Sequence, residues 1–514
     1  MTSSPDAAQV LAADRPAISA SRAAILATVM TMASYAATLL QFVVYARTLG
    51  VGLDTDALAI ALAWATGLAG LITTTLTGVA LPRFVRDRQA DPTGARSAFR
   101  SASALAIGTG VVLAVLTAAG ADWLASALST APEARPRVAD LMSAAGLLIV
   151  AWTVMGTLLA LANATEHYGH AAASGVAPST VVICALALSG NPTPEIAVQA
   201  YIAGAVAQIA WLAIVVRADL GAVIPKVDRS SIRAIAGRTV PMVLTLLLFN
   251  GAIVVARALA SGGPVGDVAV FDYAARLVLA GQQVLLAGVL AVALTKWSQK
   301  AGSRDTTNAQ IGRTIGIALG LVIPAATALA LLSPELVDTL LTGGRFASAD
   351  AARVADVLRW MAPGIAAQMV LLLGFRALIA YQALWPLAGI GVAHLAALAV
   401  VAAVAHPLLG VTGIGLAYSC SWLVGVVLTL VALRPLIEPG ARIGRQAVAT
   451  TIATLTAGLV AGTILQLSAA GPAIRLLIGL ATFIVVGWVV GYAAGVEFVR
   501  SITRQALAVR SSSA

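Results

Sequence analysis

Two arginines in apolar surroundings are the residues of this chain best placed to do chemistry. Arg257 lies near the end of the apolar stretch 240–260, and Arg276 lies about a turn and a half into the next stretch, 269–295. A guanidinium in hydrocarbon costs roughly 2.5–3.5 kcal/mol on insertion scales, so it persists there only beside a cavity, an ionic partner or an anionic ligand. Arginine is also a natural clamp for phosphate. The pair predicts a polar cavity inside a membrane protein and a negatively charged substrate.

Each of these residues also has a purely structural interpretation. Asp272 lies four residues before Arg276 on the same helical face, so the two are able to form an ion pair that needs no substrate. Arg257 can instead extend its side chain to the outer membrane interface from a helix end. Asp272 is thus either a cation site or an ion-pair partner. For Asp56 the sequence favours a simpler role, since an acid at the start of a helix interacts well with the helix dipole.

Several uncharged polar residues also fall within apolar segments. Some of them must line the cavity, whereas others are able to hydrogen-bond to neighbouring helices. The candidates for substrate binding besides the two arginines are Tyr35, Gln41, Asn250 and Gln282.

No group of residues predicts catalysis, so we expect no enzyme activity, metal or cofactor. His167 and His170 are three residues apart, but a solvated turn is favoured over a metal pair. His394 stands alone in an apolar segment, where a hydrogen-bonded packing residue is favoured over a proton relay. The phosphate-binding pattern GxxxxGK[ST] is absent, which argues against an ATP-driven pump.

The composition predicts an all-α polytopic membrane protein. The 514 residues are 60% hydrophobic and 11% charged, whereas soluble domains carry about 25% charged residues. The apolar runs are long and lack the alternation of a membrane barrel, and each has roughly the 20 residues that a crossing needs. We predict about fourteen transmembrane helices, at 23–46, 57–82, 99–120, 138–164, 171–189, 196–217, 233–260, 269–295, 312–333, 354–378, 384–404, 411–434, 446–468 and 472–495.

The loop charges predict the orientation. The net charge is +10, and the 32 basic residues lie mostly in short loops between apolar runs, which argues against nucleic-acid binding and for contact with anionic membrane lipids. With the N-terminus inside, 23 of them fall on the cytoplasmic side, 7 on the other side and 2 within the membrane. This bias predicts an even number of helices and places both termini in the cytoplasm.

An internal repeat divides the chain. Two acids open comparable segments, in Thr55-Asp56-Ala57-Leu58 and Phe271-Asp272-Tyr273-Ala274, and each segment ends before a basic loop. The repeat predicts two six-helix lobes related by a pseudo-two-fold axis along the membrane normal, plus two C-terminal helices. The predicted units are a cytoplasmic tail at 1–22, an N-lobe at 23–217, a linker at 218–232, a C-lobe at 233–434, helices 13 and 14 at 435–495, and a cytoplasmic tail at 496–514.

A series of short motifs over roughly residues 25–435 resembles one known family, the MviN/MurJ-type lipid II flippases of the multidrug, oligosaccharidyl-lipid and polysaccharide exporter superfamily. The motifs are Ala46-Arg47-Thr48-Leu49-Gly50, Thr55-Asp56-Ala57-Leu58, Leu259-Ala260-Ser261-Gly262, Tyr273-Ala274-Ala275-Arg276-Leu277, Thr342-Gly343-Gly344-Arg345-Phe346, Phe375-Arg376-Ala377-Leu378-Ile379-Ala380-Tyr381 and Gly413-Ile414-Gly415-Leu416-Ala417.

The resemblance implies a V-shaped, two-lobed bundle with a central cationic cavity in the bacterial inner membrane. It implies alternating access that carries a polyprenyl-pyrophosphate-linked saccharide outward, with helices 13 and 14 holding the lipid tail. Arg276 falls on one of the family's cavity arginines. The resemblance also implies coupling to the membrane potential or to Na+ or H+, and leaves room for cell-wall synthesis proteins as partners.

The chain departs from that family in its N-terminal half. The family usually carries arginines in the first two helices, where this chain has Tyr35, Gln41 and Thr74. Three alternatives therefore stay open. They are a flippase for another lipid-linked cell-wall glycan, a cation-coupled drug exporter, and a non-transporting scaffold that recruits enzymes through its cytoplasmic loops. The scarcity of intramembrane acids and the 5% aromatic content count against the drug exporter.

Overall fold

Regular structure in the described part of the chain is helical, apart from one bridge between Gly343 and Phe346. The computed structural model describes residues 20–77, 84, 92–218, 229–298, 304–380, 384–434 and 443–512. Each of the fourteen predicted segments overlaps a helix. Most of the predicted tail 1–22 and most of the predicted linker 218–232 lie outside the described residues.

The first group of helices, here the N-lobe, packs α3, α7 and α10 at its centre, with α2 on one side against α9. Short helices such as α6 and α8, which the apolar pattern did not predict separately, join longer ones. The bounds are α2 Ala20–Leu49, α3 Leu53–Thr75, α5 Pro92–Ala119, α6 Ala121–Leu128, α7 Arg135–Ala164, α8 Tyr168–Ala173, α9 Val176–Leu188 and α10 Pro194–Val215.

The second group, here the C-lobe, is centred on α15 and α17, which pack against each other and against α13 and α16 respectively. Helix α13 is followed by α14 after a bend of 67°. The bounds are α11 Arg229–Ala260, α12 Asp267–Ser298, α13 Arg304–Leu331, α14 Ser333–Leu341, α15 Ser348–Ala380, α16 Leu384–Leu409 and α17 Val411–Leu433.

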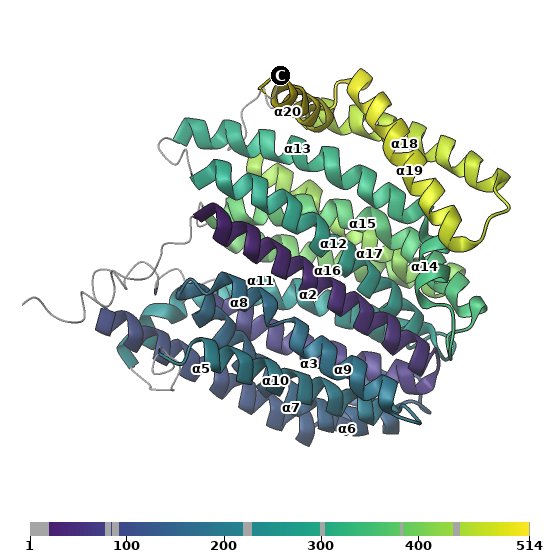
Figure 1. Ribbon diagram of the computed structural model, residues 1–514. Coiled ribbons are helices and arrows are strands. Elements are labelled where there is room, and N and C mark those ends of the chain that lie inside the picture. Colours follow the sequence, from purple (N-terminus) through teal and green to yellow (C-terminus); the bar gives the residue numbers. More distant parts are fainter. Residues whose placement is uncertain are drawn as a thin grey trace, which may run out of the picture.

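Two further long helices and a short one complete the chain. Helices α18 (Ile443–Leu467) and α19 (Pro472–Ala494) form a hairpin that packs on α13 and α14, on the far side of the C-lobe from the N-lobe (Figure 1). Residues 496–514, predicted only as a tail, contain the helix α20 (Glu497–Ser512), which packs on α13. The sequence did not reveal α20, because its arginines interrupt any apolar run.

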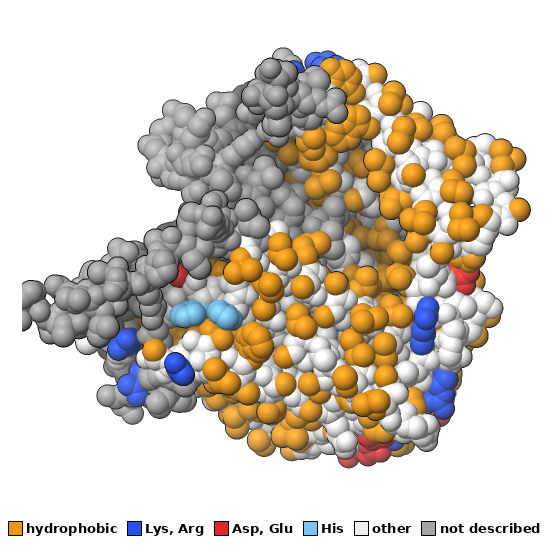
Figure 2. Space-filling view, in the orientation of Figure 1, with side chains coloured by type: hydrophobic (Ala, Val, Ile, Leu, Met, Phe, Trp, Pro, Cys, Tyr) orange, Lys and Arg blue, Asp and Glu red, His pale blue; other side chains and the backbone are white. Residues whose placement is uncertain are grey.

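The surface suits a lipid environment. Within the described residues, twelve helical segments are long and apolar enough to cross a membrane, and the bent pair α13–α14 adds a thirteenth. Hydrophobic side chains cover the broad face in Figure 2, while charged side chains gather toward its two ends. The predicted multi-pass helical membrane fold is therefore confirmed, with α12 matching the remaining predicted segment at 269–295.

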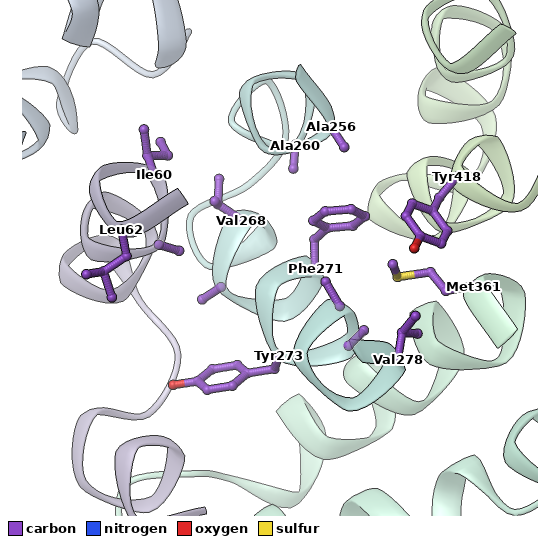
Figure 3. Packing of buried hydrophobic residues seen from close by; sticks show 14 of the residues in the cluster. Ile60, Leu62, Ala256, Ala260, Val268, Phe271, Tyr273, Val278, Met361 and Tyr418 are labelled. Carbon is purple, nitrogen blue, oxygen red and sulfur yellow. The ribbon is translucent and has the colours of Figure 1, made fainter. Parts of the chain in front are cut away.

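A continuous core crosses the interface between the lobes. It includes Leu58 and Ile60 from α3, Ala256 from α11, and Phe271 and Tyr273 from α12. Figure 3 shows Phe271 pointing toward Tyr418 and Met361 within the C-lobe, while Tyr273 points the opposite way. Because alternate side chains of α12 face different lobes, this helix joins the two halves.

The lobes meet most closely at one end of the bundle, here called the gate end. There the Arg345 amide donates to the Arg47 carbonyl (2.8 Å), the Tyr273 hydroxyl donates to the Gly50 carbonyl (2.7 Å), and the Thr130 amide donates to Ser261 Oγ (2.9 Å). Between described residues, all the inter-lobe hydrogen bonds recorded lie at this end, except one from Arg276. The opposite end, which carries His167, His170 and α20, is here called the α20 end.

Gly50 makes this close approach possible. Its φ is +69°, and a Cβ built on it would lie 2.6 Å from the Arg345 carbonyl oxygen. Other residues adopt this conformation only at a cost, and the Arg345 backbone leaves no room for a side chain.

The Gly50→Ala variant is expected to lower the free energy of unfolding by at least about 1–2 kcal/mol, the cost of a left-handed backbone alone. Thermal melting of the purified protein in one detergent measures the loss. The matched control is Gly52→Ala, because a Cβ at Gly52 meets nothing within 4 Å. Equal melting temperatures for the two variants would contradict this account of the gate end.

Candidate functional site

Three charged side chains meet inside the bundle, where α11 and α12 pack together. Arg257 donates to Asp272 Oδ1 through Nε (3.1 Å) and Nη2, and Arg276 donates to Asp272 Oδ2 through Nε (2.6 Å). Asp272 thus shares one carboxylate between two guanidinium groups. The formal charge of this triad is +1.

The position of Arg276 on α12 sets its distance from the gate end. It lies nine residues after Asp267, the first residue of the helix. At 1.5 Å per residue, Arg276 lies about 14 Å along the helix from its start at the gate end.

The exposure of the two arginines differs. The Arg257 side chain is 8% exposed, whereas that of Arg276 is 25% exposed. Arg257 is therefore held inside the protein by Asp272 and does not extend to the interface, which was its alternative interpretation. The Arg276 side chain is the more accessible of the two. Arg276 is the member of the triad that is able to reach a ligand.

The N-lobe supplies aromatic groups to Arg276. Its Nη1 donates to the Tyr201 hydroxyl (3.4 Å), and its Cζ lies 5.1 Å from the centre of the Tyr45 ring. Trp152 packs edge-on against Tyr201, with ring centroids 6.4 Å apart. The Tyr45 hydroxyl is buried without a hydrogen-bond partner among the described residues. The wall that faces the guanidinium is therefore aromatic and hydroxyl-bearing, and it can offer hydrogen bonds and flat apolar surfaces.

Sequence reasoning missed Tyr45, Tyr201 and Trp152. Tyr45 had a usable signal, because it follows the predicted residue Gln41 by four positions and so shares its helical face. Tyr201 and Trp152 come from helices distant in the sequence from Arg276. Their approach depends on packing between the lobes, which no local spacing encodes.

Asp56 lies in the first turn of its own helix, α3, as the favoured interpretation had it, but its carboxylate also bonds the start of another helix. Its two carboxylate oxygens accept hydrogen bonds from the backbone amides of Gly266 (2.6 Å) and Ala269 (2.7 Å), at the start of α12. The acid therefore satisfies amides that a helix N-terminus leaves free, and it does so across the lobe interface. The structure places Asp56 in the gate end rather than beside the triad.

No contact between described residues joins the other predicted residues to Arg276. Gln41 is buried on α2, and Tyr35 is partly exposed on the same helix. Asn250 donates to the Leu246 carbonyl of its own helix (2.9 Å), and the Gln282 side-chain oxygen is buried without a partner among the described residues. The structure thus brings together Arg257, Asp272 and Arg276 from the predicted set.

The histidines have separate surroundings. His167 Nδ1 lies 3.0 Å from Thr165 Oγ1, and His170 packs against Trp211. No group of three or more potential metal ligands occurs in the part of the chain that was described. His394 is packed among aromatic rings beside the Ser421 backbone, as expected of a packing residue, although neither ring nitrogen has a hydrogen-bond partner of good geometry among the described residues.

Comparison with known proteins identifies the family. The family model described as lipid II flippase MurJ matches residues 45–481. The chain belongs to the MurJ lipid II flippase family. Its function is the flipping of a lipid-linked precursor. None of the curated proteins compared with the chain gives a significant match.

Solved structures share the fold of this family member. A lipid II flippase MurJ in an inward closed conformation superposes with a TM-score of 0.74 at 16% identity, covering 90% of this chain and 98% of that one. An inward-facing multidrug resistance MATE family transporter gives 0.60 at 15% identity, covering 82% and 98%. A transporter of the same MOP superfamily from Pyrococcus furiosus gives 0.58 at 15% identity, covering 83% and 96%.

The shared carboxylate predicts unequal effects within the triad. Asp272→Asn leaves the buried Arg257 without its counter-charge, so we expect a loss of about 3–5 kcal/mol in the free energy of unfolding. Arg276→Ala keeps the Arg257–Asp272 pair, so its loss is expected to be less than half as large. Thermal melting and the yield of folded protein in detergent compare the two. Equal losses would show that Asp272 does not hold Arg257 in place.

Proposed function

We propose that this family member moves a polyprenyl-pyrophosphate-linked saccharide, such as a lipid II-like peptidoglycan precursor, from the inner to the outer leaflet of the bacterial inner membrane. The observation that carries the proposal is the partly exposed Arg276 side chain, whose guanidinium is held inside the bundle by Asp272. A phosphate group that leaves water needs hydrogen-bond donors and positive charge, and Arg276 offers both. The partly exposed Tyr201 ring beside Arg276 suits the apolar face of a sugar ring.

The orientation follows from the distribution of basic residues. The α20 end carries the loops that hold most of the Lys and Arg residues, so we place it and both termini in the cytoplasm. The gate end then faces the outside. In this arrangement the inter-lobe hydrogen bonds close the outer side, and the cargo headgroup enters between the lobes from the cytoplasmic side.

Transport then requires that the gate-end contacts break while the contacts at the cytoplasmic side form. Asp56 of the N-lobe bonds the start of α12, and Arg276 lies further along that helix. When the lobes separate at the gate end, Arg276 of the C-lobe therefore also moves away from Tyr201 of the N-lobe. The headgroup loses part of its binding site as the cavity opens outward. This coupling favours its release on the outer side.

The lipid tail stays in the membrane throughout. Helices α18 and α19 present exposed apolar side chains, including Leu459, Leu477 and Val489, and so offer a surface along which a polyprenyl chain can lie. Basic residues at the α20 end are placed to contact anionic lipids. This surface also leaves room for cell-wall synthesis proteins to bind as partners.

Replacing Arg276 with Ala is expected to abolish transport while leaving membrane insertion intact, because the headgroup loses its cationic donor inside the bundle. The measurement is growth of bacteria depleted of their own lipid II flippase and supplied with this chain. The matched control is Arg359→Ala, an exposed arginine paired only with the exposed Asp356, which should support growth as wild type does.

Full growth with the Arg276→Ala variant would remove the arginine from the mechanism. Failure of the correctly inserted wild-type chain would point to a different lipid-linked glycan. Rescue by Arg276→Ala together with failure of variants in the cytoplasmic loops would favour the scaffold.

The Asp56→Asn variant tests the gate end. An amide accepts the Gly266 and Ala269 hydrogen bonds less strongly than a carboxylate, which weakens the closed gate by about 0.5–2 kcal/mol, as for other helix caps. We expect spin labels at Trp123 and Leu408, exposed residues on either lobe at this end, to report a larger population of long distances. An unchanged distance distribution would mean that Asp56 does not hold the gate closed.

A further inference from the structure

The interior of the C-lobe holds a histidine that the site described above does not use. His394 is only 1% exposed and lies ten residues into α16, about 15 Å along the helix from its first residue. Neither ring nitrogen has a hydrogen-bond partner of good geometry among the described residues, and the Ser421 backbone offers the ring a weak polar contact. A neutral imidazole carries one donor and one acceptor, so burying both unpaired is less favourable than burying an apolar ring.

Aromatic rings from two other helices enclose this imidazole. Phe249 of α11 stacks on it, with centroids 4.9 Å apart and planes 25° apart, and Trp422 of α17 lies 4.4 Å away. Phe375 of α15 packs edge-on against Phe249 at 4.8 Å. The faces of aromatic rings carry partial negative charge and attract cations. This surrounding, here called the aromatic box, offers little to a neutral imidazole's polar atoms. Its ring faces attract an imidazolium but burial opposes the charge, so a proton at His394 favours arrangements of the helices in which water reaches the ring.

Among the residues whose side chains the structure describes, the other polar groups on these helices near the box are uncharged. Helix α17 contributes the Tyr418 hydroxyl, which hydrogen-bonds to Gln368 Oε1 of α15 (3.1 Å), and α11 contributes the Asn250 amide, which bonds to its own helix. The contacts recorded for described residues bring no carboxylate and no second cation against the ring. A charge at His394 therefore acts mainly on the aromatic box and on the helices that carry it.

Helix α11 links this box to the transport site. Phe249 stacks on His394, and Arg257, eight residues later on the same helix, binds Asp272. The separation is about 12 Å along one rigid helix. Helix α11 also packs against α3 of the N-lobe. A change in how Phe249 packs on the ring is thus transmitted to the triad and to the lobe interface.

We propose that His394 is a proton-binding site, and that the binding and release of one proton there biases the movement of the lobes. One proton adds to the free ring nitrogen to form the imidazolium, and its loss restores the neutral ring, so no other bond forms or breaks. If the proton enters from the outside and leaves to the cytoplasm, the proton gradient drives the cycle. The direction of proton movement rests on the proposed function, whereas the response of the lobes to pH does not.

The test measures the distance between the lobes at the α20 end as a function of pH. Both cysteines, Cys184 and Cys420, are replaced by Ala, and spin labels are attached at the exposed residues Tyr168 and Trp385. The full-length protein in lipid nanodiscs is compared at about pH 5 and about pH 8, the range in which histidine titrates. We expect the distance distribution to shift between these pH values in this background and the shift to be lost in His394→Phe.

Two kinds of control make the result specific. His394→Phe supplies an apolar ring that suits the box, and His394→Gln keeps a polar side chain that does not titrate, so both should be insensitive to pH. His406→Gln removes a histidine near Gly263 and Asp267 at the gate end, and it should keep the pH response. Arg276→Ala should also keep it, because that variant removes the headgroup clamp and leaves the box intact.

A pH response that persists in both His394 variants, or that disappears in His406→Gln, would overturn the proposal. The absence of any pH response before His394 is changed would do the same. The complementation experiment is independent of these outcomes. If the chain rescues growth but shows no pH response, only the proton-binding site is contradicted. If it shows a pH response but does not rescue growth, only the proposed cargo is contradicted.

Discussion

One carboxylate shared between two guanidinium groups is the interaction on which the rest of the structure depends. Without Asp272, the buried Arg257 would be a cation with no counter-charge. With it, Arg257 is held inside the protein while the Arg276 side chain stays partly exposed. The same helix, α12, begins at the gate end, where Asp56 of the N-lobe binds its first amides. Cation site and gate therefore lie on one rigid element, and neither can move without the other.

The N-lobe does not mirror the C-lobe at this site. Among the described residues its contributions to Arg276 are the Tyr45 ring and the Tyr201 hydroxyl, so the charge recorded at this site is that of the C-lobe triad and sums to +1. A pyrophosphate diester carries more negative charge than this triad neutralises. The aromatic wall must then contribute through hydrogen bonds and contact with the sugar. This asymmetry leaves other lipid-linked glycans as competing cargoes.

Much of the architecture was predictable from the sequence, because apolar runs of membrane length and loop charges are local signals. The ion pair of Asp272 with Arg276 was visible from their spacing of four residues. The role of Asp56 was not, since its partners, Gly266 and Ala269, lie more than two hundred residues away and only the packing of the lobes brings them near. Asp56 and Asp272 occupy corresponding positions in the internal repeat, yet Asp56 caps a helix and Asp272 binds arginines. Helix α20 was missed because its arginines break its apolar pattern.

The most direct test of the central claim asks whether water and cargo reach position 276. In a chain whose two native cysteines are replaced, Arg276→Cys is exposed to a charged, membrane-impermeant thiol reagent, with and without added lipid-linked saccharide. The account predicts that the cysteine reacts from the cytoplasmic side and that the saccharide protects it. A cysteine that stays unmodified from either side in folded protein, or that reacts equally with and without the saccharide, would contradict it.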